Sequence, residues 1–117
     1  MDSERPIQAT CPECRGPLSE KVKTDGERKI CEYTCLVGHT YSARALLEAH
    51  SDTEERVLWS AVVALEEAQA LVDAVQGEFK PEIASRLKAQ AKLKLEQAEE
   101  VRKILERLQP FQTGPIG

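Results

Sequence analysis

The sequence of 117 residues predicts a small α+β protein in which a β-hairpin precedes a short helix and a long antiparallel α-hairpin. Three observations predict this fold class. Two groups of cysteine and histidine residues flank a stretch with the alternation of a strand. Two segments after residue 53 repeat apolar residues at helical spacing. A glycine and a proline, Gly77 and Pro81, separate those two segments.

Two short turns carry four side chains that are typical metal ligands: Cys11 and Cys14, then Cys35 and His39. The first turn reads Cys-Pro-Glu-Cys, and the second reads Cys-Leu-Val-Gly-His. A Cys-x2-Cys turn places two sulfurs close enough to share a tetrahedral ion, and a hairpin would bring the second pair alongside. The spacing predicts a zinc ribbon with two knuckles that hold one structural Zn²⁺. Because four protein ligands leave no open position for water, we expect no catalysis by the metal.

Cys31 is a fifth candidate ligand, but it stands four residues before Cys35 on a predicted strand. Four strand residues span about 13 Å, so its sulfur should not reach the same ion. We therefore expect Cys31 to act as a small apolar residue that is buried under the hairpin. A spare or redox-responsive thiol is the alternative.

A set of four cysteines could instead form disulfides in a secreted chain. Residues 1–10 are polar, however, and lack the apolar core of a signal peptide. No apolar run approaches the length of about 20 residues that spans a bilayer. We therefore expect a reduced, cytoplasmic protein without a membrane segment.

The sheet elements are predicted on both sides of one turn. Residues 18–23 and 28–35 should form two strands, because the dipeptide Asp25-Gly26 between them favours a tight hairpin turn. Residues 1–10 contain Pro6 and are expected to be a flexible lead-in.

Two candidate helix starts follow the second knuckle. Ser42 is a good N-cap for a short helix over residues 43–50, which would complete a zinc-ribbon unit over residues 11–50. The capping-box pattern from Ser51 to Glu54 predicts that a new helix begins near Thr53. One continuous helix across this point is the alternative.

Residues 51–109 are predicted to form a helical hairpin, with helices at about 54–76 and 82–108, followed by a flexible tail at 110–117. The first helix carries one apolar row at Val57, Ala61, Ala64, Ala68, Leu71 and Val75, and an adjoining row at Leu58, Val62, Leu65 and Val72. The second helix carries a stripe at Ala84, Leu87, Ala91, Ala98, Val101, Leu105 and Leu108. Two helices alone cannot enclose such broad faces, so we expect a homodimer built as a four-helix bundle. A monomeric hairpin is the alternative.

Three further side chains have predicted places. Tyr41 follows the second knuckle and should cover the metal site. Trp59 should pack against the ribbon or the short helix, with a partner-binding anchor as the alternative. His50 should be a surface or cap residue rather than a ligand.

The charge balance bears on the partners of the protein. The chain has 16 basic and 20 acidic side chains and a net charge of −4. Neutralising the phosphates of nucleic acid requires a basic excess, which this sequence lacks. Binding of DNA or RNA is therefore disfavoured, although it is the common role of a zinc ribbon.

Several motifs together resemble a known family. They are the run from Cys11 to Leu18, Tyr33-Thr34-Cys35-Leu36-Val37-Gly38-His39-Thr40-Tyr41-Ser42, Leu46-Leu47, Leu58-Trp59-Ser60-Ala61 and Ala64-Leu65-Glu66-Glu67. They resemble the zinc-ribbon-plus-helix tail of bacterial chemotaxis-type protein-glutamate methylesterases, over roughly residues 11–75. That family commonly has a histidine after the third ligand, where this chain has Leu36, which favours His39 as the nitrogen ligand. Residues beyond about 80 are not covered.

The catalytic part of that family has no counterpart here. Its serine-histidine-aspartate site lies in an α/β domain that would precede Cys11, and the sequence has no Gly-x-Ser-x-Gly turn. We therefore expect a non-catalytic protein-interaction or regulatory module, and the resemblance implies a role in bacterial chemosensory or two-component signalling. The alternatives are a nucleic-acid-binding zinc ribbon and a thiol or zinc redox sensor that uses Cys31.

Overall fold

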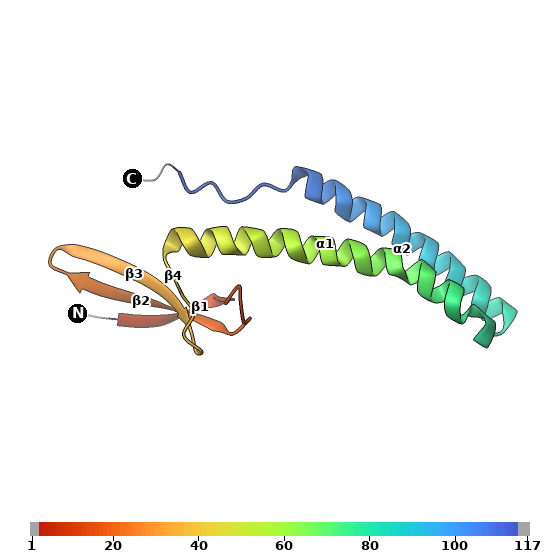
Figure 1. Ribbon diagram of the computed structural model, residues 1–117, viewed down its shortest axis with the longest axis horizontal. Helices are drawn as coiled ribbons and strands as arrows, with labels where there is room; N and C mark the ends of the chain where they lie inside the picture. Colours follow the sequence, from red (N-terminus) through yellow and green to blue (C-terminus); the bar gives the residue numbers. More distant parts are fainter. Residues whose placement is uncertain (1–2, 115–117) are drawn as a thin grey trace. The chain divides into compact units, whose positions relative to one another are not determined.

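The computed structural model describes residues 3–114 as an α+β fold with one four-stranded antiparallel sheet and two α-helices (Figure 1). The elements are β1 (Ser3–Thr10), β2 (Pro17–Asp25), β3 (Arg28–Cys35), β4 (Thr40–Tyr41), α1 (Ala43–Val75), a 3₁₀ turn (Gln76–Glu78) and α2 (Pro81–Arg107). The described chain divides into two compact units. The sheet unit comprises residues 3–53 and 110–114, and the helical hairpin comprises Glu54–Gln109.

The sheet follows the chain in the order β1-β2-β3-β4. Asp25 pairs with Arg28, so Gly26 and Glu27 form a two-residue turn between β2 and β3. Gly26 has φ +67°, a conformation that glycine adopts without a steric penalty. The predicted hairpin is thus confirmed, with Gly26 at the first turn position rather than the second.

The prediction of a flexible lead-in is wrong for residues 3–10, which form the edge strand β1. Arg5 pairs with Glu20 on β2, and the Arg5 Nε donates to the Glu20 Oε1 at 2.9 Å. Pro6 fits because an edge strand does not need every N–H for the ladder. The polar composition concealed this strand, since most of its side chains are exposed.

The core of the sheet unit lies at the end of the sheet that carries the predicted ligands. Four side chains are buried together, namely Cys11, Leu18, Cys35 and Tyr41. Ile7, Tyr33, Leu46 and Ala49 pack against them, so the first turns of α1 cover this core. Ser42 caps α1 as predicted, because the Ala45 N–H donates to its Oγ at 3.1 Å.

The predicted break near residue 51 is wrong, and α1 is the continuous helix that was the alternative. The hydroxyl of Thr53 donates to the carbonyl oxygen of Ala49 one turn earlier, at 3.0 Å. The Ser51 Oγ accepts the N–H of Phe111 at 2.9 Å. Both side chains that suggested a capping box therefore make other bonds, and the backbone continues as helix.

Residues 110–114 have no helix or strand, but they make specific contacts within the sheet unit. Besides the bond to Ser51, the Arg44 guanidinium donates to the Thr113 Oγ1 at 2.6 Å and to the Gly114 carbonyl oxygen at 3.1 Å. The ring of Phe111 lies 6.3 Å from the ring of His50, which is an exposed side chain as expected. The expectations for residues 1–2 and 115–117 lie outside the described residues.

The helical hairpin joins α1 to α2 through the 3₁₀ turn, and Pro81 occupies the first turn of α2 as predicted. The two helices are antiparallel. The most buried side chains along their contact are Val62 on α1 and Ala91 and Ala98 on α2. The Arg102 guanidinium donates to both carboxylate oxygens of Glu66, at 3.1 and 3.0 Å. None of the helices in residues 3–114 combines the length and the apolar character needed to cross a membrane.

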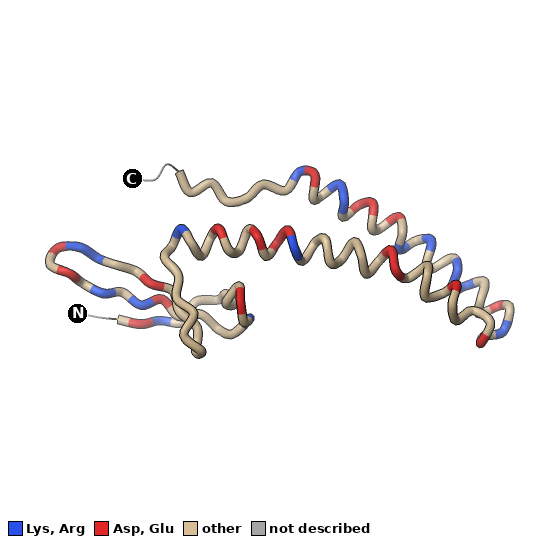
Figure 2. Tube along the Cα trace, viewed as in Figure 1, with Lys and Arg blue, Asp and Glu red and all other residues tan. Residues whose placement is uncertain are grey.

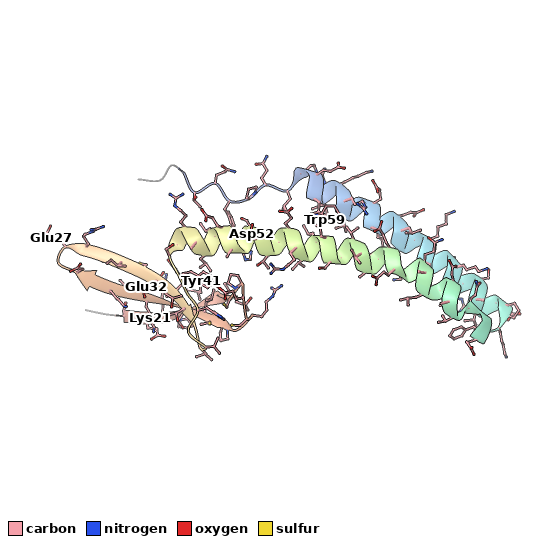
Figure 3. The ribbon with its side chains drawn as sticks, in the orientation of Figure 1. Lys21, Glu27, Glu32, Tyr41, Asp52 and Trp59 are labelled. Atoms are coloured by element: carbon pink, nitrogen blue, oxygen red, sulfur yellow. The ribbon has the colours of Figure 1, made fainter. Side chains whose placement is uncertain are left out.

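Trp59 does not lie in the core of the sheet unit, so its principal predicted position is wrong. The side chain belongs to the helical hairpin (Figure 3), and it is 45% exposed. The Arg102 guanidinium carbon lies 5.5 Å from the centre of the indole ring, a cation–π contact.

Candidate metal centre

The first knuckle is the turn that follows β1. Within it, the Arg15 N–H donates to the Cys11 carbonyl oxygen at 2.8 Å, and the Cys11 N–H donates to the Gly16 carbonyl oxygen at 2.7 Å. Arg15 has φ +63°, which is uncommon for a residue other than glycine. This tight closure turns the side chains of Cys11 and Cys14 toward one point.

The second knuckle connects β3 to β4. The Gly38 N–H donates to the Cys35 carbonyl oxygen at 3.1 Å, and the Cys35 N–H donates to the His39 carbonyl oxygen at 3.1 Å. Gly38 has φ +99°, a value that a side chain would strain. Leu18 pairs with Cys35 across β2 and β3, so the sheet register brings the second knuckle beside the first.

All four predicted ligands converge. One ligand atom from each of Cys11, Cys14, Cys35 and His39 lies within 4.8 Å of the others. The Cys14 and Cys35 sulfurs are 3.6 Å apart, and the His39 Nδ1 lies 3.3 Å from the Cys35 sulfur and 3.5 Å from the Cys11 sulfur. A tetrahedron with metal–sulfur bonds of about 2.3 Å has sulfur–sulfur edges of about 3.8 Å. The cluster therefore fits a tetrahedral metal ion, with the Nδ1 as the nitrogen ligand.

A second layer of contacts fixes the orientation of the histidine. The His39 Nε2 lies 3.1 Å from the Glu13 Oε2, on the ring side opposite the sulfurs. The Tyr41 hydroxyl donates to the Glu13 Oε1 at 2.7 Å and lies 3.5 Å from the Cys11 sulfur. A carboxylate on the far nitrogen is the usual way in which proteins fix the tautomer of a metal-binding histidine. Tyr41 therefore covers the site as predicted.

Hydrogen bonds hold the Cys11 thiol in a form suited to metal binding. Burial raises the pKa of Cys11, but the bond with the Tyr41 hydroxyl and backbone bonds at Cys14 and Glu13 outweigh it and lower this pKa to about 6. The same environment raises the pKa of Tyr41, chiefly through burial. The metal-free site thus favours a thiolate at Cys11 beside a neutral phenol.

The pKa values of Cys35 and His39 shift in opposite directions. Burial raises the pKa of Cys35, but backbone hydrogen bonding at His39 and the contact with Cys14 outweigh it and lower this pKa. Hydrogen bonding with Cys35 raises the pKa of His39 more than burial lowers it. The two groups stabilise each other as thiolate and imidazolium when no metal is present, and a bound cation takes the place of the proton.

Cys31 is exposed on β3 and lies outside this cluster, so the expectation that it is buried is wrong. Its exclusion from the ligand set agrees with the strand-length argument. Sequence reasoning did not identify Glu13 as a functional residue. The only signal was its place inside the Cys-x2-Cys turn, where its partners His39 and Tyr41 were not predictable from spacing.

The chain was compared with protein-family models, with curated proteins and with solved structures. None of the three comparisons finds a match. The resemblance to methylesterase tails therefore stays a prediction from motifs. The conclusions about function depend on the site itself.

The contact between Glu13 and His39 gives a first testable expectation. Glu13→Gln keeps the size of the side chain but removes the carboxylate charge on the His39 Nε2, so metal affinity should fall about 10- to 100-fold. Competition with a chromogenic chelator measures this affinity. Glu27→Gln, in the turn between β2 and β3, is the matched control and should bind as the wild type does. Equal affinities for the two variants would exclude a role for Glu13.

Proposed function

We propose that this chain is a non-catalytic protein-interaction module in which a zinc-bound ribbon braces the sheet unit and the helical hairpin carries the binding surface. The observation that supports it most is the convergence of Cys11, Cys14, Cys35 and His39 within 4.8 Å. Three sulfurs and one imidazole nitrogen form a donor set that suits zinc. Zinc bound there would add on the order of 10 kcal/mol to the folding of the sheet unit.

A structural role for the ion follows from the number of donors. Four protein ligands complete a tetrahedral shell, whereas catalytic zinc keeps one position for water or substrate. The residues around the cluster serve the ligands, since Glu13 and Tyr41 bond to each other and contact His39 and Cys11. A reducing compartment such as the cytoplasm would keep the thiolates available for the metal.

The helical hairpin is the better candidate for the binding surface. Trp59 and Val63 are half exposed in a shallow, open depression on the surface of α1, which Arg56, Ser60, Ala64 and Glu67 also line. Exposed aromatic side chains beside apolar neighbours are typical anchors of protein interfaces. We therefore infer that a partner protein contacts this part of α1, in a pathway that the motif resemblance suggests is chemosensory.

The charge pattern favours a protein partner over nucleic acid. Basic and acidic residues are interspersed along α2 and the β2–β3 hairpin, whereas α1 carries mostly acidic residues (Figure 2). The chain as a whole carries a net charge of −4. Phosphate neutralisation needs clustered cations, and three zinc-bound thiolates would add negative charge to the sheet unit.

Native mass spectrometry and binding assays test this proposal together. The native mass should show one zinc ion per chain, and no DNA or RNA shift should occur at micromolar protein. A folded chain without metal would contradict the proposed site. For the surface, Trp59→Ala should weaken the binding of a partner identified by affinity capture and then purified, while the zinc content stays unchanged. Leu93→Ala, on the exposed side of α2, is the control.

A further inference from the structure

An unpaired coiled-coil row runs along α1 in the helical hairpin. It consists of Val57, Ala61, Ala64, Ala68, Leu71 and Val75, which follow one another at alternating spacings of four and three. This average of 3.5 residues is the repeat that packs one helix against another. The large members remain substantially exposed, with Leu71 at 63%. The buried contact with α2 instead uses the adjacent row, which is one residue further along and includes Leu58, Val62 and Leu65.

A second row with the same spacing runs along α2. It consists of Ile83, Leu87, Gln90, Lys94, Gln97, Val101, Ile104 and Leu108. Its members at Ile83 and Ile104 are exposed. This row also precedes the buried one, at Ala84, Ala91 and Ala98, by one residue. On each helix the exposed row precedes the buried row by one residue. Because the helices are antiparallel, this shared offset places the two exposed rows on the same face of the hairpin.

We propose that a second copy of this chain covers this face and completes a four-helix bundle, with each α1 packed against the α2 of the other copy. The inference rests on the proposed role of the helical hairpin in binding and adds a second copy on another face of it. Trp59 and Val63 follow the buried row by one residue, whereas the new row precedes it, so the two surfaces lie on opposite sides of the buried contact. In this arrangement the two-fold axis runs parallel to the helices. The interface is then the same patch on both copies.

The pattern of small and large side chains fits that arrangement. Within one chain, Trp59 contacts Arg102, and Val72 lies beside Ala91. These two pairs fix how the antiparallel helices align along their axes, and the alignment places Ala68 and Lys94 at the same height. An axis parallel to the helices preserves these levels between copies. Ala68 of one copy then faces Lys94 of the other, and the small alanine leaves room for the long lysine stem.

Charge complementarity selects this axis over the alternative. In the proposed arrangement, the exposed Glu67 next to Ala68 lies beside Lys94 of the second copy, the one charged member of either row in the described chain. An axis perpendicular to the helices, centred on the same rows, would place Glu67 beside Glu67 of the second copy. Like charges at such positions oppose pairing.

Sedimentation velocity across a concentration series tests the dimer. The wild-type chain loaded with zinc should be a dimer at micromolar concentration. Leu71→Lys should raise the dissociation constant at least about 100-fold, because each copy loses the burial of one leucine. Ala70→Lys is the matched control, since Ala70 is the exposed neighbour of Leu71 on the same helix but lies outside both rows, and it should leave the constant unchanged. Circular dichroism checks that both variants remain helical.

A charge exchange tests the orientation. Lys94→Glu should weaken the dimer about tenfold by placing two carboxylates together, and adding Glu67→Lys should restore it. Failure of the double variant to recover would overturn the α1-on-α2 arrangement. A wild-type chain that stays monomeric at tens of micromolar, or equal effects of Leu71→Lys and Ala70→Lys, would overturn the dimer. Zinc content is read separately, so a metal-loaded monomer would leave the metal-braced module standing.

Discussion

Replacing Cys35 with serine is expected to release the metal ion and unfold the sheet unit. Cys35 is buried, and its sulfur lies 3.6 Å from Cys14 and 3.3 Å from the His39 Nδ1, so it is central to the ligand set. The sheet unit buries few large side chains besides its ligands, and Leu18 is its largest fully buried residue. A core of this size needs a metal or a disulfide to stay folded.

The loss should be large because metal binding and folding are coupled. Structural zinc sites contribute on the order of 10 kcal/mol, and a serine oxygen is a much poorer ligand than a thiolate. Hydrogen exchange should show that the amides of β1 to β3 lose their protection in the variant. Excess chelator added to the wild-type chain should cause the same loss. The helical circular dichroism of residues 54–109 should largely remain, because their contacts lie within the helical hairpin.

Cys31→Ser is the matched control for this experiment. It makes the same substitution on the same strand, but its side chain is exposed and outside the cluster. Its zinc content and stability should match those of the wild type. If Cys35→Ser kept one tightly bound zinc ion and full protection of the sheet, the ligand assignment would be wrong.

The second large effect is expected from Val62→Asp in the helical hairpin. Val62 is 0% exposed at the contact between α1 and α2. An aspartate there would bury a carboxylate without a partner, which should lower the free energy of unfolding by about 3–5 kcal/mol. Thermal and urea unfolding, followed by the helical circular dichroism signal, measure this loss.

Val63→Asp separates burial from helix propensity. It introduces the same residue at the next position of the same helix, where the valine is 50% exposed. Its free energy of unfolding should change by no more than about 0.5 kcal/mol. Similar destabilisation by the two variants would mean that the row containing Val62 does not form the helix contact.

Local spacing determined much of the site. Cys11, Cys14, Cys35 and His39 were identifiable because each pair lies in one short turn whose reach is fixed by the backbone. The strand Arg28–Cys35 and the start of α2 at Pro81 were also predictable, because alternation and a proline at the first helical turn are local signals. The helix cap at Ser42 belongs to the same group.

Three of the failures occurred where a polar residue is ordered by partners that local sequence patterns do not show. The capping box from Ser51 to Glu54 was not used, because Phe111 donates to Ser51 and Thr53 bonds back along the helix. The strand β1 was missed, because its polar residues gain their order from pairing with β2. Glu13 was missed for the same reason, since its role depends on His39 and Tyr41.

The sequence by itself determined the four candidate metal ligands, the order of sheet and helices, and the two apolar rows on α1. Only the tertiary structure decided which row the intramolecular contact uses, which histidine nitrogen faces the sulfurs, and that one helix continues through residue 51. The physical reason is that turns and periodicity act over a few residues of chain. The choice among equivalent partners is made by packing and hydrogen bonding between residues far apart in sequence.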